Sequence, residues 1–248
     1  MNEDLVDRAR RVWREAAGVP LAFPEPGGLT VAVAPGSALA PRHWVGIVEL
    51  GGAAVATVPD EAQRDLVTRA LSRPGAPRTD PEAVRALLPV AEVLGPATLA
   101  YASAATFRPA PLPGRAHTLP VEDPRVTALL DRVTPEEAGE SALAEIDSPA
   151  FVITAATGAG EAHRNDPPVL AAAGYARWPG RVAHLSVLTE PERRGRGLAR
   201  GVAGAAVAHA LARGLLPQWR ARPPASRAVA RALGCHELGA QLSLLLTP

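Results

Sequence analysis

Apolar and polar residues alternate with two periods along this chain, and each period predicts a kind of element. In the first hundred residues, apolar positions at helical spacing opposite a row of arginines predict an amphipathic helix over residues 3–17. Alternating residues predict three strands, over residues 29–34, 44–50 and 53–58. Asp60 and Asp80 are suited to cap helices, and we expect these helices to run to about Leu71 and toward Leu94.

The second half of the chain shows the same two periods. Prolines crowd residues 109–124, which predicts a linker or an extended crossing between two domains. We therefore expect an N-terminal α/β domain over residues 1–108 and a second domain over residues 117–248. Helices should begin after Asp123 and Thr134. Five strands are predicted over residues 150–155, 169–177, 182–189, 215–222 and 241–246.

The stretch from Thr189 to Arg213 carries the most specific pattern. A predicted strand ends at Thr189, an arginine- and glycine-rich turn follows, and Ala and Val then recur at helical spacing up to Gly214. Gly195 and Gly197 allow the backbone to approach a ligand closely and tolerate a positive φ. The first turn of a helix offers unpaired N–H groups and a partial positive charge. The pattern therefore predicts a pocket for an anion such as a pyrophosphate.

Two other interpretations of the glycine turn stay open. A dinucleotide-binding fingerprint needs a third small residue and, about 20 residues further on, an acidic one. Here Arg200 stands at the third position, and the following strand offers Arg220 and Arg222, which would suit a 2′-phosphate instead. The second interpretation is a surface turn with solvated arginines. It leaves the residues downstream of the predicted helix unexplained.

The amino-acid composition excludes several classes of function for this chain. The 248 residues are 47% hydrophobic and 21% charged, and a formal net charge of +1 gives no general attraction to nucleic acid or to an anionic membrane. All 26 basic residues are arginine, which excludes a P-loop and lysine Schiff-base chemistry. The single cysteine, Cys235, excludes an internal disulfide. No signal peptide, membrane-spanning run or metal-ligand spacing is visible, so we expect a cytoplasmic protein without a metal.

The residues Arg194-Gly-Arg-Gly-Leu-Ala199 resemble the acetyl-CoA signature of the GCN5-related N-acetyltransferase (GNAT) superfamily, Gln/Arg-x-x-Gly-x-Gly/Ala. Residues 225–235 are similar to the closing helix of that family, Asn-x-x-Ser-x-x-x-Ala-x-x-Leu-Gly-Phe. Together with Pro191 and Trp219, the set is closest to the subgroup that contains zwittermicin-resistance acetyltransferases. The resemblance implies an α/β (α+β) fold in the C-terminal half, with helices packed on a mixed sheet of parallel and antiparallel strands. The N-terminal domain would then be a degenerate GNAT-like unit or an unrelated small α/β domain.

The resemblance also implies transfer of an acetyl group from acetyl-CoA to an amine. The coenzyme would be bound by Val187, Leu188, Thr189, Arg194, Gly195, Arg196, Gly197, Leu198, Ala199 and Ser226. His184 is the candidate general base and Tyr175 a candidate proton donor, although both residue types more often pack or are solvated. The tyrosine with which many members protonate the leaving thiolate would fall at Ala230, which can transfer no proton. Two hypotheses follow: an N-acetyltransferase for a small-molecule amine, with a homodimer possible, and a CoA-binding module without turnover.

Overall fold

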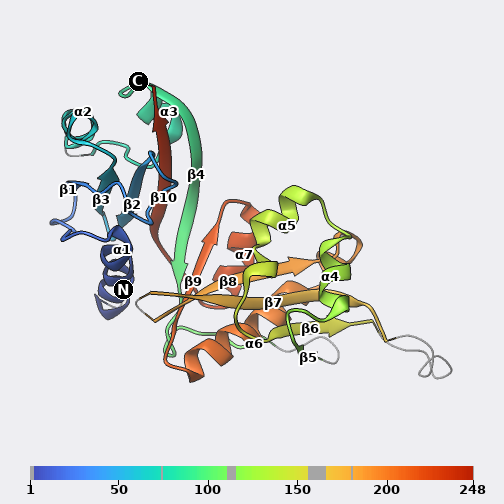
Figure 1. Ribbon diagram of the computed structural model, residues 1–248. Coiled ribbons are helices and arrows are strands. Elements are labelled where there is room, and N and C mark those ends of the chain that lie inside the picture. The colour runs from blue at the N-terminus through green and yellow to red at the C-terminus, as the bar shows by residue number, and fades with distance from the viewer. Residues whose placement is uncertain (1–2, 74, 111–115, 156–165, 180, 248) are drawn as a thin grey trace. The chain divides into compact units, whose positions relative to one another are not determined.

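The computed structural model describes residues 3–73, 75–110, 116–155, 166–179 and 181–247. The chain divides into two compact units: the first contains Met1–Tyr101, Arg220–Arg227 and His236–Pro248, and the second Ala102–Trp219 and Ala228–Cys235. Helices and a mixed set of parallel and antiparallel strands form both units, so the expected α/β fold with a mixed sheet is confirmed (Figure 1). The C-terminal residues, expected in the second domain, group with the first unit. Residues 111–115 of the proline-rich linker lie outside the described ranges.

The first unit is built from the N-terminal elements and the last strand of the chain. Its elements are α1 (Glu3–Ala17), β1 (Leu29–Val33), β2 (Val45–Leu50), β3 (Ala53–Val58), α2 (Glu61–Leu71), α3 (Pro81–Arg85), β4 (Val90–Tyr101) and β10 (His236–Leu246). The strand order is β1-β3-β2-β10-β4, with β1 parallel to β3 and the other neighbours antiparallel. The prediction that this helix would run toward Leu94 was wrong, because α3 ends at Arg85 and β4 begins at Val90. Pro89 and Pro96 could not occupy a helix interior, and the segment pairs with β10 instead.

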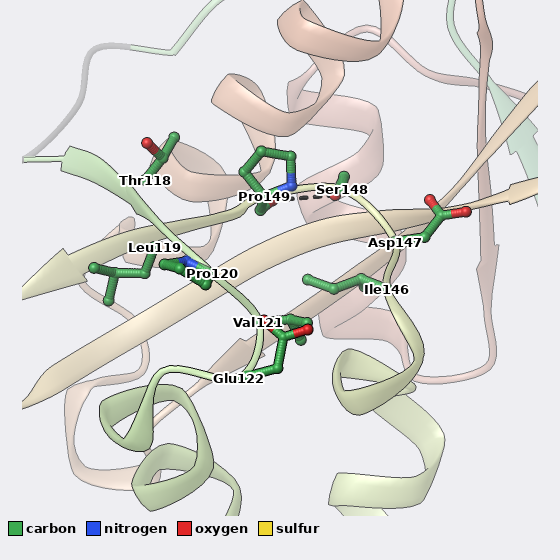
Figure 2. A pocket seen from close by; sticks show the side chains of 9 residues that line it. All are labelled: Thr118, Leu119, Pro120, Val121, Glu122, Ile146, Asp147, Ser148 and Pro149. Carbon is green, nitrogen blue, oxygen red and sulfur yellow. Dashed lines mark hydrogen bonds between the residues drawn. The ribbon is translucent and has the colours of Figure 1, made fainter.

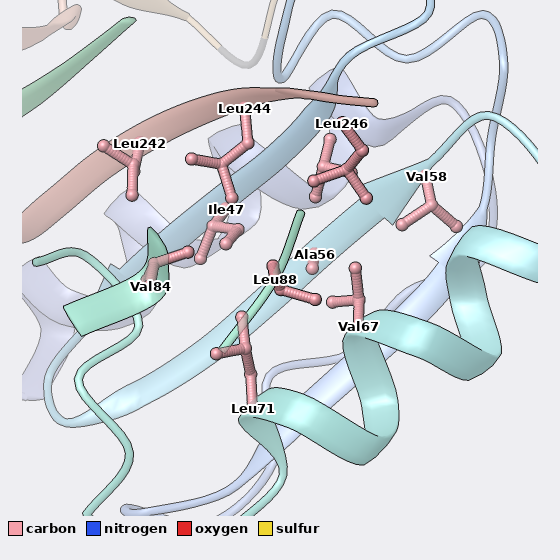
Figure 3. Packing of buried hydrophobic residues seen from close by; sticks show 11 residues of the cluster. Ile47, Ala56, Val58, Val67, Leu71, Val84, Leu88, Leu242, Leu244 and Leu246 are labelled. Carbon is pink, nitrogen blue, oxygen red and sulfur yellow. The ribbon is translucent and has the colours of Figure 1, made fainter. Parts of the chain in front are cut away.

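Both helical layers of the first unit bury apolar side chains against the sheet. Val67 and Leu71 of α2 belong to one cluster with Ile47 and Leu244 of the sheet (Figure 3). In α1, the amphipathic pattern buries Trp13 completely, and its Nε1–H donates to the Tyr101 hydroxyl at 2.7 Å. The apolar spacing read from the sequence therefore produces the core of this unit.

Strand β10 completes this sheet from the far end of the chain. It lies between β2 and β4, and its alternate residues Leu242, Leu244 and Leu246 are buried in the same cluster. Gly239 permits the close pairing with β2, because a Cβ there would overlap the carbonyl oxygen of Glu49. Without β10, strands β2 and β4 of the first unit would have no common neighbour.

The second unit contains the predicted strand–turn–helix. Its elements are β5 (Ala116–Leu119), α4 (Pro124–Leu130), α5 (Pro135–Ser141), the 3-10 helix η1 (Leu143–Glu145), β6 (Ala150–Thr154), β7 (Val169–Trp178), β8 (Val182–Thr189), the 3-10 helix η2 (Pro191–Arg193), α6 (Leu198–Ala212), β9 (Leu216–Ala221) and α7 (Pro224–Ala232). The strand order is β9-β8-β7-β6-β5, antiparallel except for β8 and β9. The ends of β9 and α7 that contain Arg220–Arg227 group with the first unit. Strand β5 was not predicted.

Helices cover both faces of the sheet in the second unit. Ala172 and Leu188 pack with Val126 and Leu129 of α4 on one face. Side chains alternate between faces along a strand, so Tyr175 of β7 points to the other face, where its hydroxyl meets His209 of α6. Strand β8 is thus held between two layers, and its C-terminal end leads directly into the glycine turn.

Candidate coenzyme-binding site

The parallel strands β8 and β9 pair only at their beginnings. Their register covers Val182–His184 of β8 against Leu216–Gln218 of β9, although β8 continues to Thr189. Within the described ranges, no strand therefore pairs with the β9 side of β8 beyond His184. The two strands splay apart and leave a strand edge available for hydrogen bonding.

Hydrogen bonds at the two ends of β8 show which of its residues face this open edge. The Glu190 N–H donates to Leu170 O at 2.9 Å on the β7 side, and the Leu216 N–H donates to Arg181 O at 2.8 Å on the β9 side. Backbone direction alternates along a strand, so even-numbered residues bond to β7 and odd-numbered residues face β9. The backbone groups of Val187 and Thr189 therefore face the open edge, whereas those of Leu188 are directed at β7.

The turn after β8 exposes backbone rather than side chains. Gly195 and Gly197 have φ values of 74° and 77°, and a Cβ at either position would meet no heavy atom within 4 Å. Gly197 is the N-cap of α6 and supplies no side-chain cap. The first N–H groups of α6, beginning at Leu198, are consequently left for another acceptor. Glycine at both positions keeps the space in front of them open.

Ion pairs hold the arginines around this turn. Arg194 Nη1 lies 2.8 Å from Glu137 Oε1, and Arg194 Nε donates to Thr189 O at 3.3 Å. Glu190 Oε1 lies 3.0 Å from Arg132 Nε, a charge contact without hydrogen-bond geometry at that nitrogen, and Arg132 also donates to Val169 O. Arg196 is exposed and makes no ion pair with any residue that the structure describes.

Arg193 Nε lacks a hydrogen-bond partner in the described part of the chain and lies 3.8 Å from Glu190 Oε2. Two more buried polar atoms beside the turn lack such a partner there: Thr189 Oγ1 at the end of β8 and Arg200 Nε in the first turn of α6. A buried polar atom without a partner is costly, and an anion that accepts from both atoms would satisfy them. With the open N–H groups of α6 and the free cation of Arg196, the residues present fit a diphosphate.

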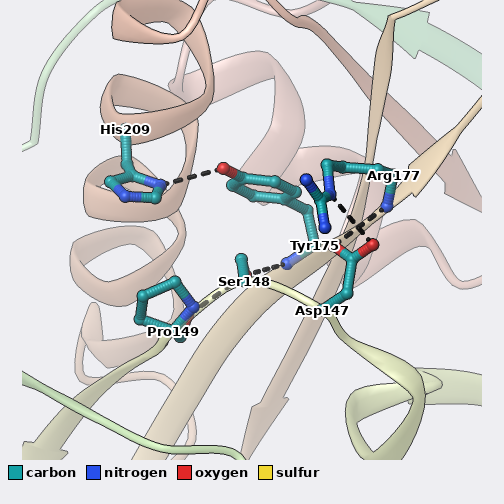
Figure 4. Close-up of polar contacts among 6 residues, drawn as sticks. All are labelled: Asp147, Ser148, Pro149, Tyr175, Arg177 and His209. Atoms are coloured by element: carbon teal, nitrogen blue, oxygen red, sulfur yellow. Dashed lines mark hydrogen bonds and ion pairs between the residues drawn. The ribbon is translucent and has the colours of Figure 1, made fainter.

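The two candidate proton-transfer residues lie on opposite faces of the sheet. His184 stacks on Trp178 at a centroid distance of 4.4 Å, and its Nδ1 lies 3.3 Å from Gln218 Nε2. Tyr175 is almost completely buried, and its hydroxyl lies 3.0 Å from His209 Nδ1 (Figure 4). Burial raises the pKa of the Tyr175 hydroxyl and lowers the pKa of His209. The structure therefore does not bring His184 and Tyr175 together.

The closing helix α7 and the residues directly after it contain the remaining residues of interest. Ser226 lies in the part of α7 that groups with the first unit, so its contact with a coenzyme at the glycine turn stays a prediction. Ala230 is buried and offers no proton. Burial raises the pKa of the Cys235 thiol to about 12, which keeps it protonated at neutral pH and suits an apolar filler.

A separate pocket of about 620 Å³ is lined by two segments (Figure 2). They are Thr118–Glu122, at and after the end of β5, and Ile146–Pro149, before β6. Hydrogen bonds fix the second segment to β7, since Tyr175 N–H donates to Ser148 Oγ at 2.8 Å and Arg177 pairs with Asp147 at 3.1 Å. In the strand order, β7 and β6 lie between β8 and β5, and none of the residues that line this pocket belongs to the glycine-turn site.

Sequence reasoning missed the residues that hold the turn and His184 in place. Glu137 was visible only as part of an N-cap pattern, and Arg132 and Gln218 carried no signal. Across the described ranges, no cluster of three or more His, Cys, Asp or Glu side chains could bind a metal ion. No helix in those ranges has the length and apolar character needed to cross a membrane.

Comparisons with known proteins agree with the predicted resemblance for one segment of the chain. Residues 155–240 match the family model of the GNAT acetyltransferases. This segment includes β7, β8, the glycine turn, α6, β9 and α7. A subgroup, such as the zwittermicin-resistance acetyltransferases, is not shown. No curated protein matches the chain significantly.

Several solved structures are similar over part or all of the chain. A GNAT-family protein from Novosphingobium aromaticivorans is 22% identical, with a TM-score of 0.43, over 62% of this chain and 65% of its own. A GCN5-related N-acetyltransferase from Kribbella flavida is 16% identical, with a TM-score of 0.46, over 62% and 58%. A tandem GNAT protein from the clavulanic acid biosynthesis pathway is 14% identical, with a TM-score of 0.42, over 100% and 97%. This chain thus spans less than two thirds of the first two proteins.

Proposed function

We propose that this protein transfers the acetyl group of acetyl-CoA to the amine of a small-molecule acceptor. One observation carries the proposal: β8 has an open edge beyond His184, and η2 and the glycine turn connect this strand to an uncapped helix terminus. A strand edge suits an extended arm with amide groups, and a helix terminus suits a diphosphate. Acetyl-CoA contains both groups in one molecule, and its thioester supplies an activated acetyl carbonyl.

The glycine turn is proposed to bind the diphosphate. Gly195 and Gly197 expose the backbone, and the first N–H groups of α6 donate to the phosphate oxygens. Arg196 adds a positive charge that no described residue neutralises. Thr189 and Arg200 can donate from their unpartnered buried atoms.

The open edge of β8 is proposed to bind the pantetheine arm and to polarise the acetyl carbonyl. Val187 directs both its N–H and its C=O at this edge, so it can pair with an amide of the arm or donate to a developing oxyanion. The C=O of Thr189 already accepts from Arg194. Of the strand residues predicted to bind the coenzyme, Leu188 contributes packing rather than hydrogen bonds, because its backbone is directed at β7 and its side chain lies in the core.

An attacking amine must be neutral, so a proton has to leave the acceptor. His184 is the proposed proton-transfer group, because it lies on β8 at the point where the strands begin to diverge, and its ring is held by Trp178 and Gln218. We do not extend this role to Tyr175, whose hydroxyl is buried against His209.

A thioester-consumption assay with acetyl-CoA and a panel of small amines tests the proposed function. We expect CoA release that depends on the amine, and a lower kcat for His184→Ala with little change in the KM for acetyl-CoA. Acetylation of a peptide N-terminus but of no small amine would correct the acceptor class. An unchanged kcat in His184→Ala would remove His184 from the mechanism.

A second function is favoured by Ala230, which stands where many related enzymes have a proton-donating tyrosine. In that case the unit binds acyl-CoA and reports its level or serves a partner, without turnover. Binding of CoA with no transfer to any amine of the panel would support this alternative over the first.

A further inference from the structure

Arg194, the first arginine of the glycine turn, contacts two other residues of the protein, Glu137 and Thr189. The guanidinium of Arg194 contacts two different elements: its Nη1 lies 2.8 Å from Glu137 Oε1 of α5, and its Nε donates to Thr189 O of β8 at 3.3 Å. Glu137 is therefore the charge partner of Arg194 in the described part of the chain. This arginine joins α5, the end of β8 and the turn into one assembly.

Glu137 is itself held in position by the N-terminus of α5. Its backbone N–H donates to Thr134 Oγ1 at 3.2 Å, and its Oε2 accepts from the Thr134 N–H at 3.4 Å, which completes a capping box. The two oxygens of one carboxylate thus serve different partners, Thr134 and Arg194. The hydrogen bond from Arg194 also holds the pKa of Glu137 below its ordinary value, so the carboxylate is charged at neutral pH.

A second carboxylate beside the turn, that of Glu190, also pairs with arginines. Glu190, the residue after β8, lies 3.0 Å from Arg132 Nε and 3.8 Å from Arg193 Nε. The carboxylate of Glu137 therefore pairs with Arg194, and that of Glu190 with Arg132 and Arg193. Arg196 is the arginine inside the turn that no described carboxylate neutralises.

We propose that Glu137 is a positioning residue for the coenzyme site, which acts by holding Arg194 against Thr189 O as a latch. The latch fixes the end of β8 relative to the turn, so that the strand edge and the helix terminus are both in place when the coenzyme binds. It assigns Arg194 to structure and leaves the recognition of phosphate to the backbone, Arg196 and the unpartnered atoms of Thr189 and Arg200. This inference rests on the proposed function of the site.

Matched variants of α5 test the latch. Glu137→Gln weakens the contact with Arg194 by removing its negative charge, whereas Glu136→Gln removes the same charge from the neighbouring exposed residue of the first turn of α5. Calorimetric titration with CoA should show a Kd raised about threefold to fivefold for Glu137→Gln, which is the upper range for an exposed ion pair. Glu136→Gln should bind as tightly as the unmodified protein or slightly tighter, because removal of a negative charge favours an anion.

A double-mutant cycle separates a latch from two independent effects. If Glu137 acts through Arg194, the variant with both Glu137→Gln and Arg194→Gln should bind CoA no more weakly than Arg194→Gln alone. In turnover, Glu137→Gln should raise the KM for acetyl-CoA and leave kcat unchanged. Equal affinities for Glu137→Gln and Glu136→Gln, or additive losses in the cycle, would overturn the latch. Failure of the unmodified protein to bind CoA would instead overturn the proposed function.

Discussion

An aspartate at Gly195 would test the glycine turn without disturbing the fold. Gly195 is exposed, has a φ of 74° and has no heavy atom within 4 Å of the position where a Cβ would stand. The new carboxylate would therefore extend into the open space in front of the turn. That space is where the diphosphate has to lie if the backbone N–H groups bind it.

The expected loss of affinity follows from Coulomb's law. A carboxylate about 5 Å from each of two phosphate charges in a water-like dielectric costs about 0.8 kcal/mol per pair, or about 1.7 kcal/mol in all, which raises the Kd about 15-fold. The left-handed backbone adds about 1 kcal/mol of strain to the folded state, which corresponds to a Tm lower by about 2–4 °C in a protein of this length. The strain acts on stability, and the charge acts on binding.

Isothermal titration calorimetry with CoA measures the first effect and a thermal melt the second. Gly18→Asp is a matched control, because Gly18 is also exposed, has a φ of 70° and has no heavy atom within 4 Å of its Cβ position. It should share the loss of Tm and keep the affinity. The difference between the two variants should shrink as salt is raised. Equal affinities in Gly195→Asp and Gly18→Asp would refute the placement of the diphosphate at this turn.

Three further results are expected. The first unit should add no second coenzyme site, because Asp60 Oδ1 caps the start of α2 by accepting from the Gln63 N–H at 2.8 Å, and both edges of β3 are paired with other strands. Calorimetry should therefore give one coenzyme site per chain, and two sites would contradict this prediction. Native Cys235, whose pKa burial raises to about 12, should react with a thiol reagent near neutral pH only after unfolding, so rapid labelling of the native protein would show the burial to be wrong. Trp13→Phe removes the 2.7 Å hydrogen bond to Tyr101 and should lower the free energy of unfolding by about 1–2 kcal/mol in a denaturant titration, whereas an unchanged midpoint would mean that this bond adds nothing.

Local patterns were sufficient to predict most elements of this fold. Alternation predicted β2 and β3, and Thr134 and Asp123 marked the starts of α5 and α4. The glycine turn was predicted from local rules too, since positive φ and an uncapped helix start follow from glycine itself.

Long-range pairing could not be predicted in the same way. Leu242, Leu244 and Leu246 indicate a strand with one buried face, but nothing in their spacing shows that β10 lies between β2 and β4 of the first unit. The splay of β8 from β9 is likewise a property of two strands and their register. The contact of Glu137 with Arg194 joins residues 57 positions apart, and each residue alone resembles an ordinary exposed charge.

A crystal structure of the protein with acetyl-CoA would test the central claim most directly. We predict the diphosphate within hydrogen-bond distance of the backbone N–H groups between Gly195 and Ala199, and the thioester beside Val187 at the open edge of β8. Density for the coenzyme elsewhere on the chain, or a nicotinamide dinucleotide bound in the glycine turn instead, would contradict it.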